Sequence, residues 1–295
     1  MKKPHLLLWD ALSLPEPEAA EAWREWRAVA KLDDLDRSSF QMLPLLAGKI
    51  GAWVDGHPDA PVLLGICRRA WSQRQMTWRA IRQAVETLDQ AGIRRVAAVG
   101  PLVWGELYWP QNSIRPASHA ELLIDRESLA PAVNALSRAG WTRAYARPNF
   151  FVHMRSSSGE VRLNTRPVPI ADLPFLRTAW PEFETIQLGG MAVAIVPPEY
   201  ALVTILAGYI QDGVDWRCDA LSICRATLIN WDRVAVLLRW RTGARRRLRE
   251  LRDFAPADIQ AGAGQTTTWR RPFEAMAGWL RKAYGALALR SPPRG

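Results

Sequence analysis

Short runs of apolar and β-branched residues alternate with helix-like segments through the middle of the chain, and this alternation limits the folds open to it. The runs predict strands at 93–100, 121–124, 141–146, 150–155, 160–164 and 191–196. Helical spacing at 102–109 and 128–139 separates the first three, and a Ser-Ser-Ser-Gly turn joins the fourth and fifth. Strands interrupted by helices predict an α/β (α+β) core, in which helices pack on a small mixed sheet.

Segments with helical spacing flank this core on both sides. Before it, they cover 18–31 and 61–91, and another helix opens at Asp36 or Ser38, where either side chain caps free amides. After it, helices are expected at 200–210, 215–228, 231–241, 242–254 and 272–287, with Asn230 as a cap and a linker at about 255–268. The sequence therefore predicts an N-terminal helical region (1–92), an α/β core (93–196) and a C-terminal helical region (197–295).

The chain of 295 residues carries a net charge of +10 that comes almost entirely from arginine. Arginine binds phosphate in a bidentate manner, so nucleic acid or a nucleotide is one class of partner that this charge allows. Seven arginines crowd one helical region: Arg239, Arg241, Arg245, Arg246, Arg247, Arg249 and Arg252. A compositional bias and a solvated helix face explain the same pattern, and both interpretations stay open at this point.

Apolar runs and cysteines exclude other classes. No apolar run reaches the roughly 18 residues of a membrane span, and the first apolar stretch is too short for a secretory signal. The three cysteines, Cys67, Cys218 and Cys224, are odd in number and include no Cys-x-x-Cys pair, which argues against a disulfide framework or a zinc knuckle. We expect a cytoplasmic protein without a membrane partner.

A series of motifs runs in a fixed order from about residue 38 to residue 254. They are Met-Leu-Pro-Leu-Leu (42–46), Arg-Arg-Ala-Trp-Ser-Gln-Arg-Gln (68–75), Ala-Gly-Ile (91–93), Tyr108 before Arg115-Pro116, Gly140-Trp141, Pro197-Pro198-Glu199, Trp216 before Asp219-Ala220, and Asn-Trp-Asp-Arg (230–233). Their order and spacing resemble those of the bacterial uncharacterised nucleotidyltransferases of the polymerase-β-like superfamily. Each motif alone is weak, and the shared order carries the resemblance.

The resemblance implies transfer of a nucleoside monophosphate from an NTP to a hydroxyl or similar acceptor. In that family, two magnesium ions bind an Asp-x-Asp pair on one strand and a third Asp on a later strand. Alternation places residues i and i+2 of a strand on one face, and magnesium prefers carboxylate oxygens. A glycine after the first strand lets backbone amides approach the phosphates.

This sequence keeps the order of the family's motifs, but other residues stand at the positions of the metal-binding carboxylates. Gly100 matches the family's glycine, with Val99 in place of a lysine, and the Asp-x-Asp positions fall on His119 and Glu121. The third acidic position falls on Arg162, in the stretch Arg-Leu-Asn-Thr. We expect neither a catalytic residue nor a metal ligand here, because neutral imidazole is a poor magnesium ligand and Arg162 repels the ion. The expected remnant of the pocket consists of Gly100, Arg115, His119, Glu121, Arg162 and Asn164.

Three functions follow as hypotheses. The favoured one is a catalytically inactive accessory protein that binds a protein or peptide partner, or a ligand such as a nucleotide, for a peptide-modifying or polymer-modifying enzyme system. It needs no cofactor. The first alternative is a divergent transferase that uses Mg²⁺ and an NTP through Glu121, and the second is an arginine-rich RNA-binding module.

Single residues also allow two interpretations. We interpret His119 and His153 as packed histidines rather than catalytic ones. We interpret Trp104, Trp109 and Trp141 as core residues rather than residues that stack on a base.

Overall fold

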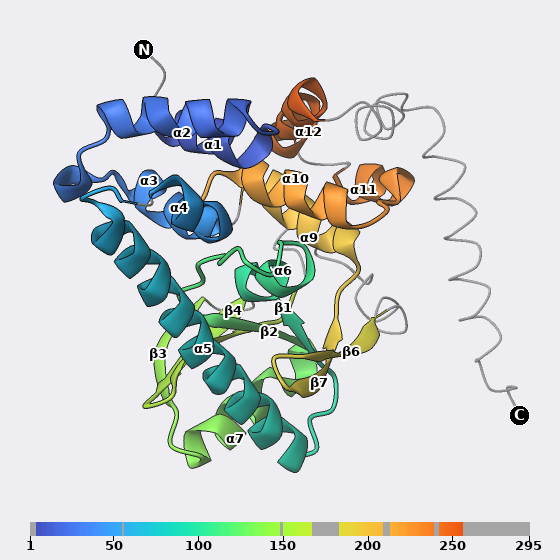
Figure 1. Ribbon diagram of the computed structural model, residues 1–295. Helices are drawn as coiled ribbons and strands as arrows, with labels where there is room; N and C mark the ends of the chain where they lie inside the picture. The colour runs from blue at the N-terminus through green and yellow to red at the C-terminus, as the bar shows by residue number, and fades with distance from the viewer. Residues whose placement is uncertain are drawn as a thin grey trace, which may run out of the picture.

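A computed structural model describes residues 4–54, 56–147, 150–166, 183–208, 213–238 and 242–255. In these residues, seven strands form one mixed sheet in the order β3-β4-β5-β2-β1-β7-β6 (Figure 1). The strands are β1 Val96–Val99, β2 Ala120–Ile124, β3 Thr142–Arg147, β4 Phe151–Ser156, β5 Gly159–Asn164, β6 Glu184–Leu188 and β7 Met191–Ile195. β1 pairs in parallel with β7 and β2 with β5, whereas the other neighbours are antiparallel. The predicted mixed α/β fold is confirmed.

The helices fall close to the predicted segments. They are α1 Pro4–Ser13, α2 Glu18–Val29, α3 Arg37–Met42, α4 Ala47–Trp53, α5 Ala60–Gln90, α6 Pro101–Leu107, α7 Leu129–Arg138, α9 Pro198–Leu206, α10 Trp216–Ala226, α11 Trp231–Leu238 and α12 Thr242–Phe254, with 3-10 turns η1 Leu32–Asp34, η2 Leu43–Leu46 and η3 Arg126–Ser128. The helix expected at 272–287 and the linker beyond Ala255 lie outside the described residues. Within those residues, no helix combines the length and apolar composition that crossing a bilayer requires.

Local signals placed the helix ends correctly. Asp36 caps α3, since its carboxylate accepts the backbone N–H of Ser39 at 2.9 Å. Asn230 precedes α11 and accepts the N–H of Arg233 at 3.1 Å. The long helix α5 ends just before Gly92, which has a φ of +76°. These caps confirm three of the predicted boundaries.

Neither α1 nor β6 was predicted. α1 contains the continuous apolar run 6–9, which shows no helical period, and its buried residues are Leu7, Leu8, Trp9 and Ala11. β6 is a short strand with few apolar residues, and it turns into β7 through Gly189 and Gly190, both with positive φ. A Cβ on Gly189 would lie 2.4 Å from the ring of Trp78, so this hairpin packs directly on α5.

The buried apolar residues form two cores, one mainly between helices and one between α5, α7 and the sheet, and α5 contributes to both. Figure 1 shows α1–α4 and α9–α12 gathered above, with the sheet and α7 below and α5 reaching into both parts. Leu63 and Cys67 of α5 join the helical core, whereas Trp78, Ile81 and Leu88 join the core between α5 and the sheet. The expected N-terminal and C-terminal helical regions therefore share one core.

Strand alternation separates the two faces of the sheet. Leu122 on β2, and Val161 and Leu163 on β5, belong to the core beneath α5 and α7. Residues between them, such as Glu121 and Arg162, face the opposite side. The face away from α5 is thus polar near β2, β4 and β5.

A buried ion pair ties the segment between α6 and β2 to the helical layer. Arg115 is 1% exposed and makes two hydrogen bonds to Asp219 of α10, at 2.8 Å and 2.7 Å. Trp109 donates to the same carboxylate at 3.2 Å, and Arg115 donates to the carbonyl of Pro116 at 2.6 Å. Glycine at position 105 makes room for Arg115, because a Cβ there would lie 2.7 Å from the Arg115 Cβ.

Replacing Asp219→Ala should lower the free energy of unfolding by about 3 to 5 kcal/mol, because it leaves the Arg115 guanidinium buried without a counter-charge. Urea unfolding at neutral pH measures the effect. Glu250→Ala removes the exposed partner of Arg246, a pair 2.9 Å apart, and is the matched control with an expected loss of about 0.5 kcal/mol or less. Equal losses in the two variants would contradict a structural role for the buried pair.

Candidate functional site

The pairing of three strands aligns polar residues that are far apart in the sequence. Glu121 of β2 is the register partner of Arg162 on β5, and Arg162 is in turn the partner of His153 on β4. Residues in register on neighbouring strands project from the same face. Glu121, Arg162 and His153 therefore form a row across the polar face of the sheet.

Glu121 is the centre of this row. It is 6% exposed, and one carboxylate oxygen, Oε2, accepts hydrogen bonds from the Arg162 guanidinium and, at 3.1 Å, from Nδ2 of Asn164. The other oxygen, Oε1, lies 3.4 Å from Nε2 of His119. A buried carboxylate needs such partners, because burial without them carries a large desolvation penalty.

Gly100 completes the environment of this carboxylate. It has a φ of +86° and precedes α6, so a side chain would be strained at this position. A Cβ on Gly100 would also lie 2.8 Å from the carboxyl carbon of Glu121. The resemblance implied a glycine here that lets backbone amides approach phosphates; in the structure its close neighbour is the Glu121 carboxylate.

The charge of Glu121 is fixed by its neighbours. Burial alone would raise the pKa of this carboxyl, but the positive charge of Arg162 and the hydrogen bond and charge of His119 outweigh burial and lower it to about 2. The carboxylate is therefore ionised at every ordinary pH. Its negative charge is balanced by a guanidinium that is itself permanently protonated.

Two histidines extend the polar row. Nδ1 of His119 lies 2.9 Å from the Ser118 hydroxyl, and the His119 ring meets the His153 ring edge-on at 4.9 Å. Nε2 of His153 lies 3.6 Å from Glu160. Burial, together with the positive charges of His119 and Arg162, lowers the pKa of His153, which favours its neutral form. His153 is thus a packed, uncharged histidine, in agreement with its interpretation from the sequence.

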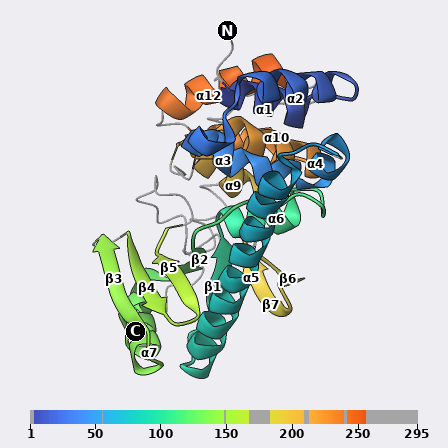
Figure 2. The same cartoon turned by 60° about the vertical axis from the view of Figure 1, so that its left-hand side comes forward.

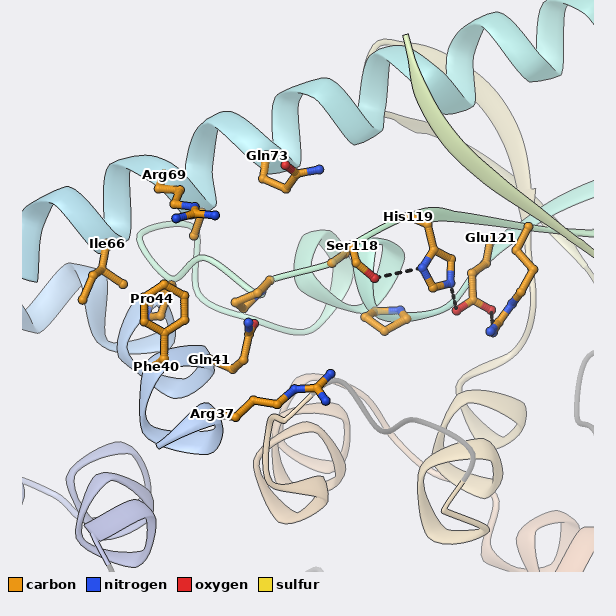
Figure 3. A pocket seen from close by; sticks show the side chains of 15 residues that line it. Arg37, Phe40, Gln41, Pro44, Ile66, Arg69, Gln73, Ser118, His119 and Glu121 are labelled. Carbon is orange, nitrogen blue, oxygen red and sulfur yellow. Dashed lines mark hydrogen bonds and ion pairs between the residues drawn. The ribbon is translucent and has the colours of Figure 1, made fainter. Parts of the chain in front are cut away.

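A cavity of about 590 Å³ opens beside this row (Figure 3). Its inner wall consists of residues 116–119 together with Glu121 and Arg162. Its outer walls come from α3, η2 and α5, and Figure 3 shows Arg69 and Gln73 facing the space from α5 and Arg37 and Gln41 facing it from α3. Pockets of this volume hold small organic ligands.

Five of the six residues expected in the remnant pocket come together. Gly100, His119, Asn164 and Arg162 all surround the Glu121 carboxylate. Arg115 lies apart: it does not line the cavity, and its guanidinium is bound to Asp219. Its contribution to the site is indirect, because it fixes the segment that carries Ser118 and His119.

Sequence reasoning missed the outer wall of the cavity. Ile66, Arg69, Ala70 and Gln73 follow the i, i+3, i+4, i+7 spacing of one helix face, and all four line the cavity. Phe40 of α3 lines the cavity as well. The mixed polarity of the α5 face was the available signal, since a core-facing stripe would not contain Arg69 and Gln73.

The tryptophans and the arginine-rich helix contribute to packing. Trp104 and Trp141 are 3% and 2% exposed, and the Trp109 indole is bound to Asp219. On α12, Arg247 donates to the carbonyl of Ile205 at 3.1 Å and lies over the ring of Trp216. These contacts favour the interpretation of the tryptophans as core residues and give one of the clustered arginines a structural role.

The residues around Glu121 do not fit a magnesium ion. In the described part of the chain, no group of three or more His, Cys, Asp or Glu side chains is arranged to hold a metal. The Glu121 carboxylate already contacts a guanidinium and an imidazole, and neither supplies the oxygen ligands that magnesium prefers. A second cation beside Arg162 would also be repelled by it.

No model of a known protein family matches this chain, and no curated protein matches its sequence. The relation to the nucleotidyltransferases accordingly stays a prediction that rests on the order of the motifs.

Arg162→Gln should lower the free energy of unfolding by about 3 kcal/mol, because it leaves the buried Glu121 carboxylate without its main counter-charge. Glu121→Gln in the same chain removes that charge, so the double variant should recover part of the loss. A double-mutant cycle by urea unfolding at neutral pH measures the coupling. Strictly additive losses would contradict the ion pair.

The low pKa of Glu121 makes one contribution to stability depend on pH. The folded value, about 2, is below the ordinary 4.5, so the contribution is complete above pH 4.5 and is lost as the pH falls toward 2. The stability difference between the wild type and Glu121→Gln should therefore shrink by about 3 kcal/mol over this window. Urea unfolding at several pH values measures it, and the dependence should weaken in the Arg162→Gln background.

Proposed function

We propose that this chain is a nucleotidyltransferase-like protein that has lost metal-dependent transfer and acts as an accessory binding protein. One observation carries the proposal. The Arg162 guanidinium is bound to Glu121 at the position where the resemblance calls for an acidic metal ligand. A fixed cation takes the place of a metal-binding carboxylate.

The convergence of Gly100, His119, Glu121 and Arg162 supports the resemblance. Gly100 follows β1, His119 and Glu121 lie at β2, and Arg162 lies on β5, and the resemblance implies that they meet at one place. An unrelated α/β fold gives no reason for these four positions to surround one carboxylate. The geometry is therefore what a remnant of that catalytic site should have.

Loss of the reaction follows from electrostatics. Two-metal transfer stabilises the charge that develops on the attacking and leaving oxygens, and it requires several carboxylates to hold the ions. Near Glu121 the neighbouring groups are a guanidinium, an imidazole and an amide. They favour an anion over a divalent cation.

An accessory role uses what the chain keeps, namely a ligand-sized cavity and a large helical layer. The cavity lies between these helices and the sheet, so a ligand in it contacts both parts. We expect the physiological partner to be a protein or peptide of a peptide-modifying or polymer-modifying enzyme system. A nucleotide that binds here does so without magnesium.

The wild type should neither release pyrophosphate nor form a nucleotidylated product with ATP, GTP, CTP or UTP, and magnesium should not strengthen nucleotide binding in calorimetry. The combined change His119→Asp, Glu121→Asp and Arg162→Asp restores acidic ligands and should raise magnesium affinity. Glu160→Asp, an acid exchange away from Glu121, is the control. Circular dichroism verifies that each variant is folded.

Other outcomes favour the two alternative functions. Magnesium-dependent release of pyrophosphate that Glu121→Gln abolishes would establish a divergent transferase and overturn the proposal. RNA binding that weakens steeply with salt, and is unchanged by variants in the cavity, would instead favour the arginine-rich RNA-binding module. A folded triple variant without increased magnesium affinity would contradict the assignment of these positions.

A further inference from the structure

The outer half of the cavity is built from residues that the nucleotidyltransferase remnant does not include. Arg37 and Gln41 lie on α3, and Arg69 and Gln73 lie on α5. Figure 3 shows the two pairs facing the space from opposite walls, with Ser118 and His119 at its inner end. The cavity is thus lined by cations and hydrogen-bond donors on several sides.

Arg69 differs from other arginines near this space. Arg74, further along α5, is paired with Glu106 at 2.6 Å, and Arg115 is paired with Asp219. No described residue forms an ion pair or hydrogen bond with Arg69, although its side chain lines the cavity. Its guanidinium keeps all its donors available for a ligand.

The charge of the lining is unequal. Three guanidiniums, those of Arg37, Arg69 and Arg162, line the cavity together with one carboxylate, that of Glu121. Three positive charges and one negative charge leave a net charge of +2 when His119 is neutral. Arginine stays protonated at every physiological pH, so the excess is +2 or more whether or not His119 is protonated.

The cavity also has an apolar end. Phe40, Pro44 and Ile66 lie together at the end away from Glu121, with Arg69 beside them (Figure 3). A volume of about 590 Å³ exceeds what a bare inorganic anion fills. A ligand that matches this lining has a compact anionic group and an apolar body.

We propose that this cavity binds a phosphomonoester with an aromatic or aliphatic body, and binds it without a metal ion. A phosphomonoester carries a charge of about −1.5 to −2 at neutral pH and three acceptor oxygens, which matches the excess charge and the guanidinium and amide donors. A carboxylate or sulfonate carries one charge and balances only half of the excess. This inference rests on the proposed function and names the ligand class of the same cavity.

Calorimetry in the presence of EDTA, with three small probes, tests the charge and the body separately. Phenyl phosphate should bind saturably with a Kd below about 1 mM. Benzenesulfonate has the same ring and a single charge, and inorganic phosphate has the charge without the ring, so each should bind at least about tenfold more weakly. Binding of benzenesulfonate as tight as that of phenyl phosphate would overturn the selection of a dianion.

Variants of α5 locate the site. Arg69→Gln should weaken phenyl phosphate binding by about tenfold or more, because it removes a charge-assisted contact. Arg68→Gln is the matched control, since Arg68 is exposed on the same helix and does not line the cavity. Both residues are exposed, so neither change should disturb the fold, which circular dichroism verifies. Equal effects of the two substitutions would overturn this placement of the site.

Different measurements would overturn the proposed loss of nucleotidyl transfer and the proposed phosphomonoester site. Pyrophosphate release with magnesium and an NTP would overturn the loss of transfer, whatever phenyl phosphate does. Absence of saturable phenyl phosphate binding, in a protein that releases no pyrophosphate, would overturn only the phosphomonoester site. Phenyl phosphate binding that requires added magnesium and disappears in EDTA would also overturn it.

Discussion

A buried charge must meet a counter-charge, and the Arg115–Asp219 pair is where this constraint holds the molecule together. Asp219 belongs to the helical layer, whereas Arg115 belongs to the segment that enters the central strand β2. Separating the pair would leave an unpaired ion in an apolar environment. The pair therefore holds the helical layer and the segment before β2 in one relative position. The residues that follow Arg115 form the inner wall of the cavity, so its shape depends on this ion pair.

The same constraint acts at Glu121, with a different consequence. This carboxylate is also buried and also paired with an arginine, but Arg162 lines a cavity rather than a closed core. A metal ion at such a place exchanges with solution, and its affinity depends on the protonation of its ligands. A guanidinium is covalently attached and permanently charged. Under the proposed function, an arginine in place of a metal ligand therefore makes the cleft attract anions without magnesium.

Local patterns predicted the elements of this site, and nonlocal pairing decided its geometry. Period-two alternation placed His119 with Glu121, and Arg162 with Asn164, on common strand faces. Which strands pair, and in which register, depends on contacts between distant segments. Only the parallel pairing of β2 with β5 brings Arg162 onto Glu121. The resemblance anticipated that meeting, whereas strand patterns alone did not. The sequence analysis placed Arg115 in the same pocket as Glu121. Its actual partner, Asp219, lies 104 residues later, and nothing in the local sequence of Arg115 reveals it.

The sequence did not predict the outer wall of the cavity, because helix periodicity shows which side chains share a face of the helix but not what that face contacts. Phe40 and Ile66 look like core residues, yet they line the cavity together with Arg69 and Gln73. A helix face that mixes apolar and cationic side chains is unfavourable against a dry core, where an unpaired guanidinium would lose its hydration. Beside a cavity the same mixture is tolerated, because water or a ligand satisfies the charge. Arg69 is exposed, lines the cavity and has no partner among the described residues, and this makes it the residue through which an anionic ligand is best detected.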